Sequence, residues 1–478
     1  MSEPIILAID QGTSGTKAIV FQAGRGVLAV AEEVLRPTYG EGGSVEQDPE
    51  ALYSSVIAAG RTALAQAGVV ADVVGLANQG ETVLAYELGS AKALTPCIVW
   101  QDRRSAAICA SRSDSADRIA ELTGLTLDPY FAAPKARWIR ENLTTQGVVT
   151  TSDAWLVHCL TGEFVTDAST ASRTLLLDLD TTEWSDELHA LLGLGDEQRP
   201  NIVDCAQVVG ETTAFGDRAI PLAGLIVDQQ AALFAEGCLT AGTAKCTYGT
   251  GAFLLANTGT AATRSAHGLA TSIAWRLGGA TTYCVDGQAF TVASAVRWLQ
   301  DLGIIKSPDQ LDIVGSTVAN AGGVSFVPAL AGLGAPWWRS DVSGAIIGLR
   351  LDTGPGHLVR ALVDGIAAQV VELATAAAGD VGAPLLRLRV DGGLTRSRLL
   401  MQTQADLLQL PVEVYPSAHA TALGAASMAR LAMTPALEPD AALDESVPAV
   451  QYLPQISADE AAERMGIFRA TVTGLVTG

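Results

Sequence analysis

One short stretch of the chain combines an aspartate, glycines, hydroxyls and a lysine between two apolar runs. It reads AIDQGTSGTKAIVF, and its apolar flanks predict two strands joined by a turn. The backbone N–H of Gly12 and the hydroxyls of Thr13 and Ser14 suit phosphate oxygens, and Lys17 adds a positive charge. Asp10 is placed to hold Mg²⁺ through water. The lysine does not open a helix, so this is no P-loop, and an ordinary hairpin turn is the alternative interpretation.

A second candidate for chemistry lies in the stretch LIVDQQAALF. Asp228 and Gln229 directly follow an apolar strand. A carboxylate at that point can accept a proton from a substrate hydroxyl, which is the work of a general base. The alternative is an aspartate that only caps the helix that follows it.

Two glycine-rich turns lie in the second half of the chain. The segment YGTG, which contains Thr250, separates two strands and repeats the pattern of the first hairpin. Together, the two hairpins predict a clamp on a polyphosphate, although YGTG alone is more typical of a plain turn. The segment VDGGLTRS places Gly393 between a strand and a helix, where backbone can approach an adenosine closely.

Composition limits the class of protein. The 478 residues exceed what one hydrophobic core supports, and the net charge of −21 argues against nucleic-acid or anionic-membrane partners. Seven scattered cysteines favour a reduced, cytoplasmic location, and five dispersed histidines argue against a zinc site. We find no secretion signal at the N-terminus and no apolar run of membrane-spanning length.

The elements that must position these residues alternate between strands and helices in both halves. After the first hairpin, Asp48 as N-cap, Pro49 at the first helical position and Gly68 at the end predict a helix. Strand–helix alternation indicates mixed α/β layers. Because each half has its own glycine-rich hairpin, we expect each half to contact phosphate through that hairpin.

The order of the motifs resembles the FGGY family of carbohydrate kinases, and most of all its glycerol kinase branch. The resemblance extends from about Ile5 to about Ala432 through the hairpin, NQGET, VWQDRR, DAWL, DQQAALF, TYGTG, DGQAF, GLGAPWW, RVDGG and TALGAA. It implies an α/β protein with a two-domain actin-like ATPase (ribonuclease H-like) fold and an interdomain cleft. The expected domains are residues 1–237, with the first phosphate loop and the polyol site, and 238–478, with the second loop and the adenosine site.

The resemblance also implies a role for each candidate residue, with ATP and Mg²⁺ as the cofactors. Asp228 is the expected catalytic base. The expected substrate-binding residues are Glu81, Trp100, Tyr130, Asp228 and Gln229. The expected ATP-binding residues are Gly12, Thr13, Ser14, Lys17, Thr250, Arg297, Gly393 and Ser397. Asp10 is the expected metal-associated carboxylate.

The chain departs from the glycerol kinase pattern at three positions. Gly80 stands where an arginine precedes the substrate glutamate, which opens volume for a longer acceptor unless Lys135, Arg103 or water takes the place of the guanidinium. Ala293 and Arg297 replace a glycine and a glutamine near the base of the nucleotide. The segment 210–220 lacks the glycine-rich insert associated with fructose-bisphosphate control, so we do not expect that regulation.

Three functions are compatible with the sequence. The first is an ATP-dependent kinase for a terminal hydroxyl of a small polyol, with glycerol as the default substrate. The second is a kinase for a tetritol, pentitol or ketose that Gly80 admits. The third is an actin-like ATPase switch, for which the tryptophans in VWQDRR and APWW have no evident use. The family resemblance also implies a homodimer or homotetramer.

Overall fold

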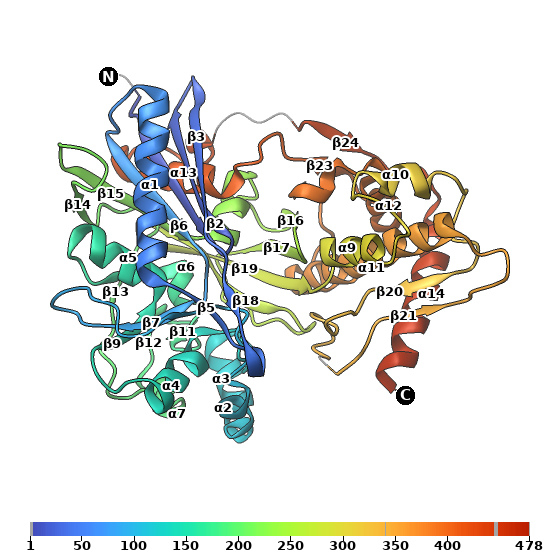
Figure 1. Cartoon of the computed structure of the whole chain (residues 1–478), viewed down its shortest axis with the longest axis horizontal. Helices are drawn as coiled ribbons and strands as arrows, with labels where there is room; N and C mark the ends of the chain where they lie inside the picture. The colour runs from blue at the N-terminus through green and yellow to red at the C-terminus, as the bar shows by residue number, and fades with distance from the viewer. Residues whose placement is uncertain (1–2, 340, 444–447, 478) are drawn as a thin grey trace.

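The computed structural model describes residues 3–339, 341–443 and 448–477, which form two lobes, each built on a mixed β-sheet (Figure 1). The strands of the first sheet, in spatial order, are β14 (Gly210–Thr212), β15 (Ile220–Val227), β6 (Val73–Asn78), β1 (Ile6–Gly12), β2 (Gly15–Gln22) and β3 (Gly26–Val34). Those of the second sheet are β18 (Ala270–Leu277), β19 (Ala280–Ala289), β17 (Ala252–Gly259), β16 (Ala244–Tyr248), β22 (Leu388–Asp391), β23 (Val412–Val414) and β24 (Val450–Tyr452).

The two sheets share one strand order. In the first sheet β1, β2 and β3 are antiparallel neighbours, while β6 runs parallel to β1 and β15 parallel to β6. In the second sheet β16, β17 and β19 form the same antiparallel trio, while β22 runs parallel to β16 and β23 parallel to β22. This repetition confirms the predicted two-domain, actin-like α/β fold, which the short sequence echo of the two hairpins only suggested.

Helices cover both faces of each sheet. On the first lobe α1 (Pro49–Ala67) packs against β2 and β3, and on the second lobe α11 (Pro355–Val381) packs against β17 and β19. The ends of α1 are those predicted: the Asp48 side chain accepts hydrogen bonds from two backbone amides, and Gly68 adopts a left-handed φ of 66°. The other helices of the second half are α9 (Ala293–Asp301), α10 (Gln310–Gly315), α12 (Arg398–Leu408), α13 (Ala420–Met433) and α14 (Ala458–Thr477).

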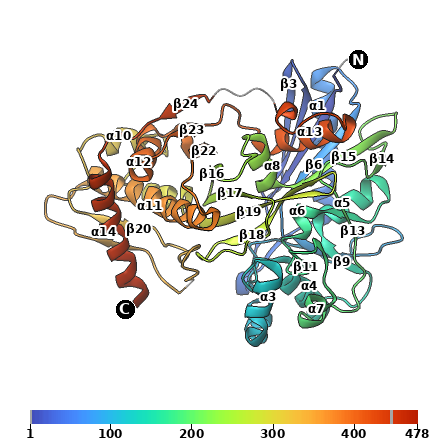
Figure 2. The ribbon, with the colours of Figure 1, turned by 180° about the vertical axis from the view of Figure 1, so that it is seen from behind.

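Helix α13 belongs to the second half of the chain but packs on the first lobe. It lies against β1, β6, β15 and α8 (Asp228–Ala235), and both views place it beside the first sheet (Figures 1 and 2). Two glycines make this approach possible. A Cβ atom on Gly75 would lie 2.4 Å from the carbonyl oxygen of Ala425, and one on Gly224 would lie 2.6 Å from the backbone nitrogen of Ala429.

A long insertion between β6 and β15 carries most of the expected acceptor-binding residues. It contributes to a third sheet, whose strands are β4 (Thr38–Tyr39), β5 (Val45–Gln47), β8 (Cys97–Ile98), β7 (Val83–Tyr86) and β9 (Val148–Thr151). Its helices are α2 (Ala106–Ala110), α3 (Ala116–Thr123), α4 (Ala132–Asn142), α5 (Ser152–Thr161), α6 (Ala168–Ala171) and α7 (Asp186–Leu191). Three two-stranded ladders complete the fold: β10 (Val165–Asp167) with β13 (Asn201–Val203), β11 (Leu177–Asp178) with β12 (Glu183–Trp184), and β20 (Ser325–Val327) with β21 (Ala345–Ile347).

Helix α11 is the one helix among the described residues that is long and apolar enough to cross a membrane. However, 78% of its most apolar window is buried inside the protein, against the core of the second lobe. That burial is typical of a core helix rather than of a membrane span.

Candidate active site

The carboxyl ends of three adjacent parallel strands bring the expected catalytic residues together. Asp10 on β1 lies opposite Ala77 on β6, and Val227 on β15 lies opposite Asn78 at the end of β6. Asp228 therefore emerges beside Glu81, which follows β6, and near Asp10. Ligands of open α/β sheets bind at this kind of edge.

Asp228 is a carboxylate with one free oxygen in a half-buried position. Its Oδ1 accepts a hydrogen bond from the backbone N–H of Gln229 (2.6 Å), and Oδ2 has no hydrogen-bond partner among the described residues. Burial, followed by the negative charges of Asp10 and Glu81, raises the pKa of Asp228 to about 7, against a weaker opposing effect of Lys245. A carboxylate with such a pKa is suited to accept a proton near neutral pH.

Beside Asp228 lies a pocket that is lined by three buried charged side chains, those of Glu81, Arg173 and Asp286. The guanidinium of Arg173 bonds Oε1 of Glu81 through Nε (2.6 Å) and Oδ1 of Asp286 through Nη1 (2.6 Å), and all three side chains are at most 10% exposed. Burial alone would lower the pKa of Arg173, but the charges of Asp286 and Glu81 hold it well above its ordinary value. The triad joins the two halves of the chain, since Asp286 lies on β19.

Two aromatic rings, those of Tyr130 and Phe253, line the same pocket, and Trp100 packs on both of them. The ring of Trp100 lies edge-on to Tyr130 (5.5 Å between centroids) and to Phe253 of the second half (6.3 Å). Its Nε1–H donates a hydrogen bond to Oγ1 of Thr13 (2.9 Å), in the first phosphate turn. Rings and charged groups around one small cavity suit an acceptor that has a carbon face and several hydroxyls.

The two side chains named as possible substitutes for the missing arginine, Lys135 and Arg103, are both engaged elsewhere. Lys135 is fully buried and donates to the carbonyl oxygens of Pro129, Tyr130 and Phe131 at 2.6–2.8 Å, and burial lowers its pKa to about 7. Arg103 pairs with Asp128 (2.7 Å). The guanidinium in the acceptor pocket is instead that of Arg173.

Sequence reasoning missed four residues of this site: Arg173, Lys245, Phe253 and Asp286. Lys245 is fully buried, and its Nζ donates to Oε1 of Gln229 (2.6 Å) and to Oγ1 of Thr247 (2.8 Å), so it orients an expected substrate-binding residue. Lys245 and Phe253 lie on either side of YGTG, and Asp286 is the first residue of DGQAF. Their nearness to these motifs could have pointed to them as site residues. Arg173 lies in a segment whose residues are typical of a turn. Its charge next to an apolar run was the one feature of the sequence that could have indicated a role in the site.

The first phosphate turn has the geometry of a tight hairpin. Gly12 pairs with Gly15, so Thr13 and Ser14 are the two turn residues. The Thr13 carbonyl oxygen accepts a hydrogen bond from the Gln47 side chain (2.7 Å). Beside it, Lys17 forms an ion pair with Glu32 (3.2 Å) and lies opposite Asp10 in the ladder, where its charge counteracts the raised pKa of Asp10. The turn therefore presents backbone and hydroxyl donors with a cation at one side.

The second half places two glycine turns side by side. The turn with Thr250 follows β16, the turn with Gly393 follows β22, and these strands are parallel neighbours. Gly392 has a φ of 95°, and a Cβ atom on it would lie 2.4 Å from the carbonyl oxygen of Tyr248, so only glycine fits there. Both Thr250 and Gly393 are accessible at this edge.

The remaining expected nucleotide residues lie further from the turns. Arg297 is exposed on α9, and no hydrogen bond or ion pair engages it within the described part of the chain. The hydroxyl of Ser397 caps α12 by accepting from the Leu400 amide, and it donates to Oδ1 of Asp312. A nucleotide contact by Ser397 stays a prediction.

The residues around Asp10 fit a hydrated cation. Burial raises the pKa of Asp10 to about 6, and its carboxylate has no hydrogen-bond partner among the described residues. Asp391, across the cleft on β22, has a buried Oδ1 that is likewise unsatisfied. The described residues contain no cluster of three or more ligands that would enclose a bare metal ion. This donor set suits Mg²⁺ that keeps its water and binds phosphate, rather than a closed cage.

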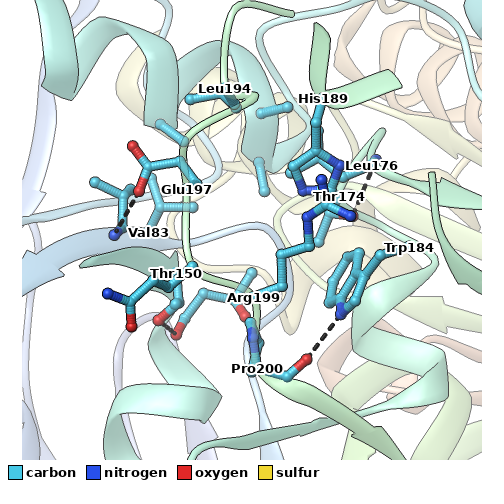
Figure 3. A pocket seen from close by; sticks show the side chains of 16 residues that line it. Val83, Thr150, Thr174, Leu176, Trp184, His189, Leu194, Glu197, Arg199 and Pro200 are labelled. Carbon is cyan, nitrogen blue, oxygen red and sulfur yellow. Dashed lines mark hydrogen bonds between the residues drawn. The ribbon is translucent and has the colours of Figure 1, made fainter. Parts of the chain in front are cut away.

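The insertion encloses a second cavity of about 40 Å³, whose lining includes Val83, Thr150 and Trp184 (Figure 3). Thr174, which directly follows Arg173 in the chain, borders it, and Glu197 and buried His189 contribute polar atoms. It contains none of the expected site residues. The acceptor pocket itself is lined by Glu81, Tyr130, Arg173, Val227, Asp228, Gln229, Phe253, Asp286 and their neighbours.

Comparison with known proteins matches both halves of the chain to one family. The N-terminal domain model of the FGGY family of carbohydrate kinases matches residues 5–235, and its C-terminal domain model matches residues 244–433. The chain belongs to the FGGY family of carbohydrate kinases. Like other FGGY kinases, it is an ATP-dependent enzyme that phosphorylates an alcohol group.

Individual relatives agree with the family match along the whole chain. The chain is 40% identical to a glycerol kinase of Alkalilimnicola ehrlichii, over 98% of this chain and 97% of that protein. It is 42% identical to a glycerol kinase of Aromatoleum aromaticum, over 89% of each. The crystal structure of Plasmodium falciparum glycerol kinase with ADP superposes with a TM-score of 0.92 at 29% identity, over 99% of this chain and 98% of that one.

Proposed function

We propose that this FGGY kinase transfers the γ-phosphoryl group of ATP to a terminal hydroxyl of a small polyol, with glycerol as the acceptor and glycerol 3-phosphate and ADP as products. The observation that carries the proposal is the position of Asp228, which lines one pocket with Glu81, Arg173 and Tyr130 and has no hydrogen-bond partner for Oδ2 among the described residues. The names of the relatives, all glycerol kinases at about 40% identity, support the choice of acceptor.

Polar oxygens and aromatic rings hold different parts of the acceptor. Glu81 and Gln229 offer oxygens to the hydroxyl groups, while the rings of Trp100, Tyr130 and Phe253 pack against the carbon chain. Arg173 fixes Glu81 by an ion pair, so that this carboxylate is preorganised before the acceptor binds. The terminal hydroxyl then lies beside Asp228.

Phosphoryl transfer needs alignment and charge neutralisation more than covalent chemistry from the protein. Asp228 accepts the hydroxyl proton as the acceptor oxygen attacks. Gly12, Thr13, Ser14 and Lys17 donate to the phosphates from one lobe. From the other lobe the nucleotide is held by residues at or near its two glycine turns and on the adjoining helices, namely Thr250, Arg297, Gly393 and Ser397. Asp10 would hold Mg²⁺ through water, and the ion supplies further neutralisation of phosphate charge when bound.

We also propose a cytoplasmic, homo-oligomeric enzyme whose halves divide at residues 237 and 238. All seven cysteines are free, in keeping with a reducing compartment. Three apolar side chains in and after β21 are exposed, Ile347 at 47%, Leu349 at 59% and Leu351 at 109%, and a second subunit would cover such a surface. Light scattering of the purified chain tests the oligomer, and a monomer at micromolar concentration would exclude it.

A coupled assay of ADP release tests the proposed reaction. The panel contains glycerol, a tetritol, pentitols and ketopentoses, each with ATP and Mg²⁺. We expect the highest kcat/KM for glycerol and only slow ADP release without an acceptor. Turnover of a longer acceptor while glycerol stays idle would contradict the proposal, as would acceptor-independent ATP hydrolysis with ATP-dependent pelleting.

A further inference from the structure

Gly80 and Val227 lie side by side at the edge of the acceptor pocket. Val227 ends β15 and lies opposite Asn78, the last residue of β6, so Gly80 follows the neighbouring strand end by two residues. The side chain of Val227 is 3% exposed, and its backbone N–H donates to Oγ of Ser169 (3.0 Å). Val227 also lines the pocket, directly before Asp228.

These two positions cannot both carry a side chain in the present arrangement. A Cβ atom on Gly80 would lie 2.9 Å from Cγ2 of Val227, closer than real Cβ contacts. The backbone of Gly80 does not demand glycine, because its φ lies outside the left-handed region, whereas Glu81 beside it has a φ of 58°. The space taken by a valine methyl, rather than the backbone conformation, therefore excludes a side chain at position 80.

The glycine at position 80 was expected to leave space for a longer acceptor, but the side chain of Val227 fills the space next to it. The isopropyl group of Val227 occupies the adjacent space, and a β-branched side chain has little rotamer freedom with which to vacate it. Val227 therefore contributes an apolar side chain to the lining of the pocket, directly before Asp228.

We propose that Val227, packed against Gly80, is the residue that limits the length of the acceptor, so that the pocket takes a three-carbon polyol and rejects four- and five-carbon ones. This inference rests on the proposed function, because it concerns the same pocket. A longer polyol would place its further hydroxymethyl group against the valine methyls. Trimming the valine is expected to relax selectivity, whereas adding volume at position 80 is expected to disturb folding unless the valine is trimmed too.

The first test measures acceptor selectivity of Val227→Ala. We expect the ratio of kcat/KM for a tetritol to that for glycerol to rise at least about tenfold, the usual effect of one methylene-sized change in a pocket. Val74→Ala is the matched control, because Val74 is an equally buried valine on β6 that does not line the pocket. Val227→Thr keeps the shape and should keep the wild-type ratio. An unchanged ratio in Val227→Ala, with glycerol still phosphorylated, would overturn the inference.

The second test measures the contact itself by thermal unfolding. Gly80→Ala should lower the Tm, and the double variant Gly80→Ala with Val227→Ala should lose less than the sum of the two single losses. Additive losses would overturn the proposed contact. The wild-type panel separates the two proposals: a wild type that ignores glycerol refutes the proposed acceptor and the length limit together, whereas glycerol turnover with an unaltered Val227→Ala ratio refutes the length limit alone.

Discussion

The indole Nε1–H of Trp100 donates a hydrogen bond to Oγ1 of Thr13 across 2.9 Å, which ties the acceptor pocket to the phosphate turn. Trp100 packs on Tyr130 and Phe253 at the acceptor, whereas Thr13 is one of the two turn residues of the first hairpin. One side chain thus links two residues that line the pocket beside Asp228 to the turn of the first hairpin. Acceptor binding and the placement of the phosphate turn are therefore expected to be coupled.

Trp100→Phe should keep the aromatic wall but lose this hydrogen bond. We expect KM for both ATP and glycerol to rise about two- to tenfold, the cost of one neutral hydrogen bond. Thr13→Val removes the same bond from the other side. If the bond is the cause, the double variant behaves like either single one, and multiplied effects would contradict the coupling.

Asp228→Asn should lower kcat by at least about a hundredfold, because the amide cannot accept the hydroxyl proton. Binding of ADP, measured by calorimetry, should stay within about twofold of wild type, since Asp228 is assigned to the acceptor and not to the nucleotide. Wild-type turnover by this variant would remove Asp228 from the role of base.

Activity should depend on pH through the carboxylate of Asp228. The base must be ionised, and its pKa is raised to about 7, so kcat/KM should rise roughly tenfold per pH unit below 7 and level off above it. The rise should be steeper below pH 6, where Asp10 is also protonated. A pH–rate profile that is flat between pH 5.5 and 8 would contradict this assignment.

The same raised pKa has the opposite effect on stability. A carboxyl whose pKa is higher in the folded than in the unfolded state binds more protons when folded, so the free energy of unfolding falls as pH rises from about 4 to about 7. The Asp228→Asn variant has no carboxyl at this position, so its free energy of unfolding should not decrease with pH for this reason. We therefore expect the inactive variant to have a higher Tm than wild type at pH 8, and an equal or lower Tm at pH 5. A variant with a lower Tm than wild type at both pH values would contradict the burial argument.

Arg173→Met should leave Glu81 and Asp286 buried without a cation. Breaking a buried pair in this way costs roughly 3–5 kcal/mol, and we expect a lower Tm together with an increase in KM for glycerol that exceeds the decrease in kcat. Arg118→Met is the matched control, because Arg118 pairs with Glu187 and Glu121 at the surface. If the two substitutions changed Tm and KM for glycerol equally, the ion pairs of Arg173 would not be what positions Glu81.

Local chemistry made part of this structure predictable. The hairpin around Thr13 and the caps of α1 at Asp48 and Gly68 follow from short-range rules of turns and helix ends, and the structure has them as expected. The grouping of Asp10 and Asp228 was also within reach, since residues at the carboxyl ends of parallel strands share one edge.

Contacts between distant segments were not predictable in this way. Arg173 meets Glu81 and Asp286 only after the insertion and the second sheet have taken their places, and no spacing in the sequence encodes those ion pairs. The same holds for the room beside Gly80. Its glycine suggested an opening, but the methyl that fills it belongs to Val227, on a strand far along the chain.

The position of α13 has a consequence for any attempt to divide the molecule. One face of the first sheet is covered by a helix from the second half of the chain, Ala420–Met433. A chain severed after residue 237 would leave the apolar surface around Gly75 and Gly224 bare, and we expect it to aggregate instead of yielding an autonomous lobe. Supplying the missing helix as a separate peptide should restore its solubility.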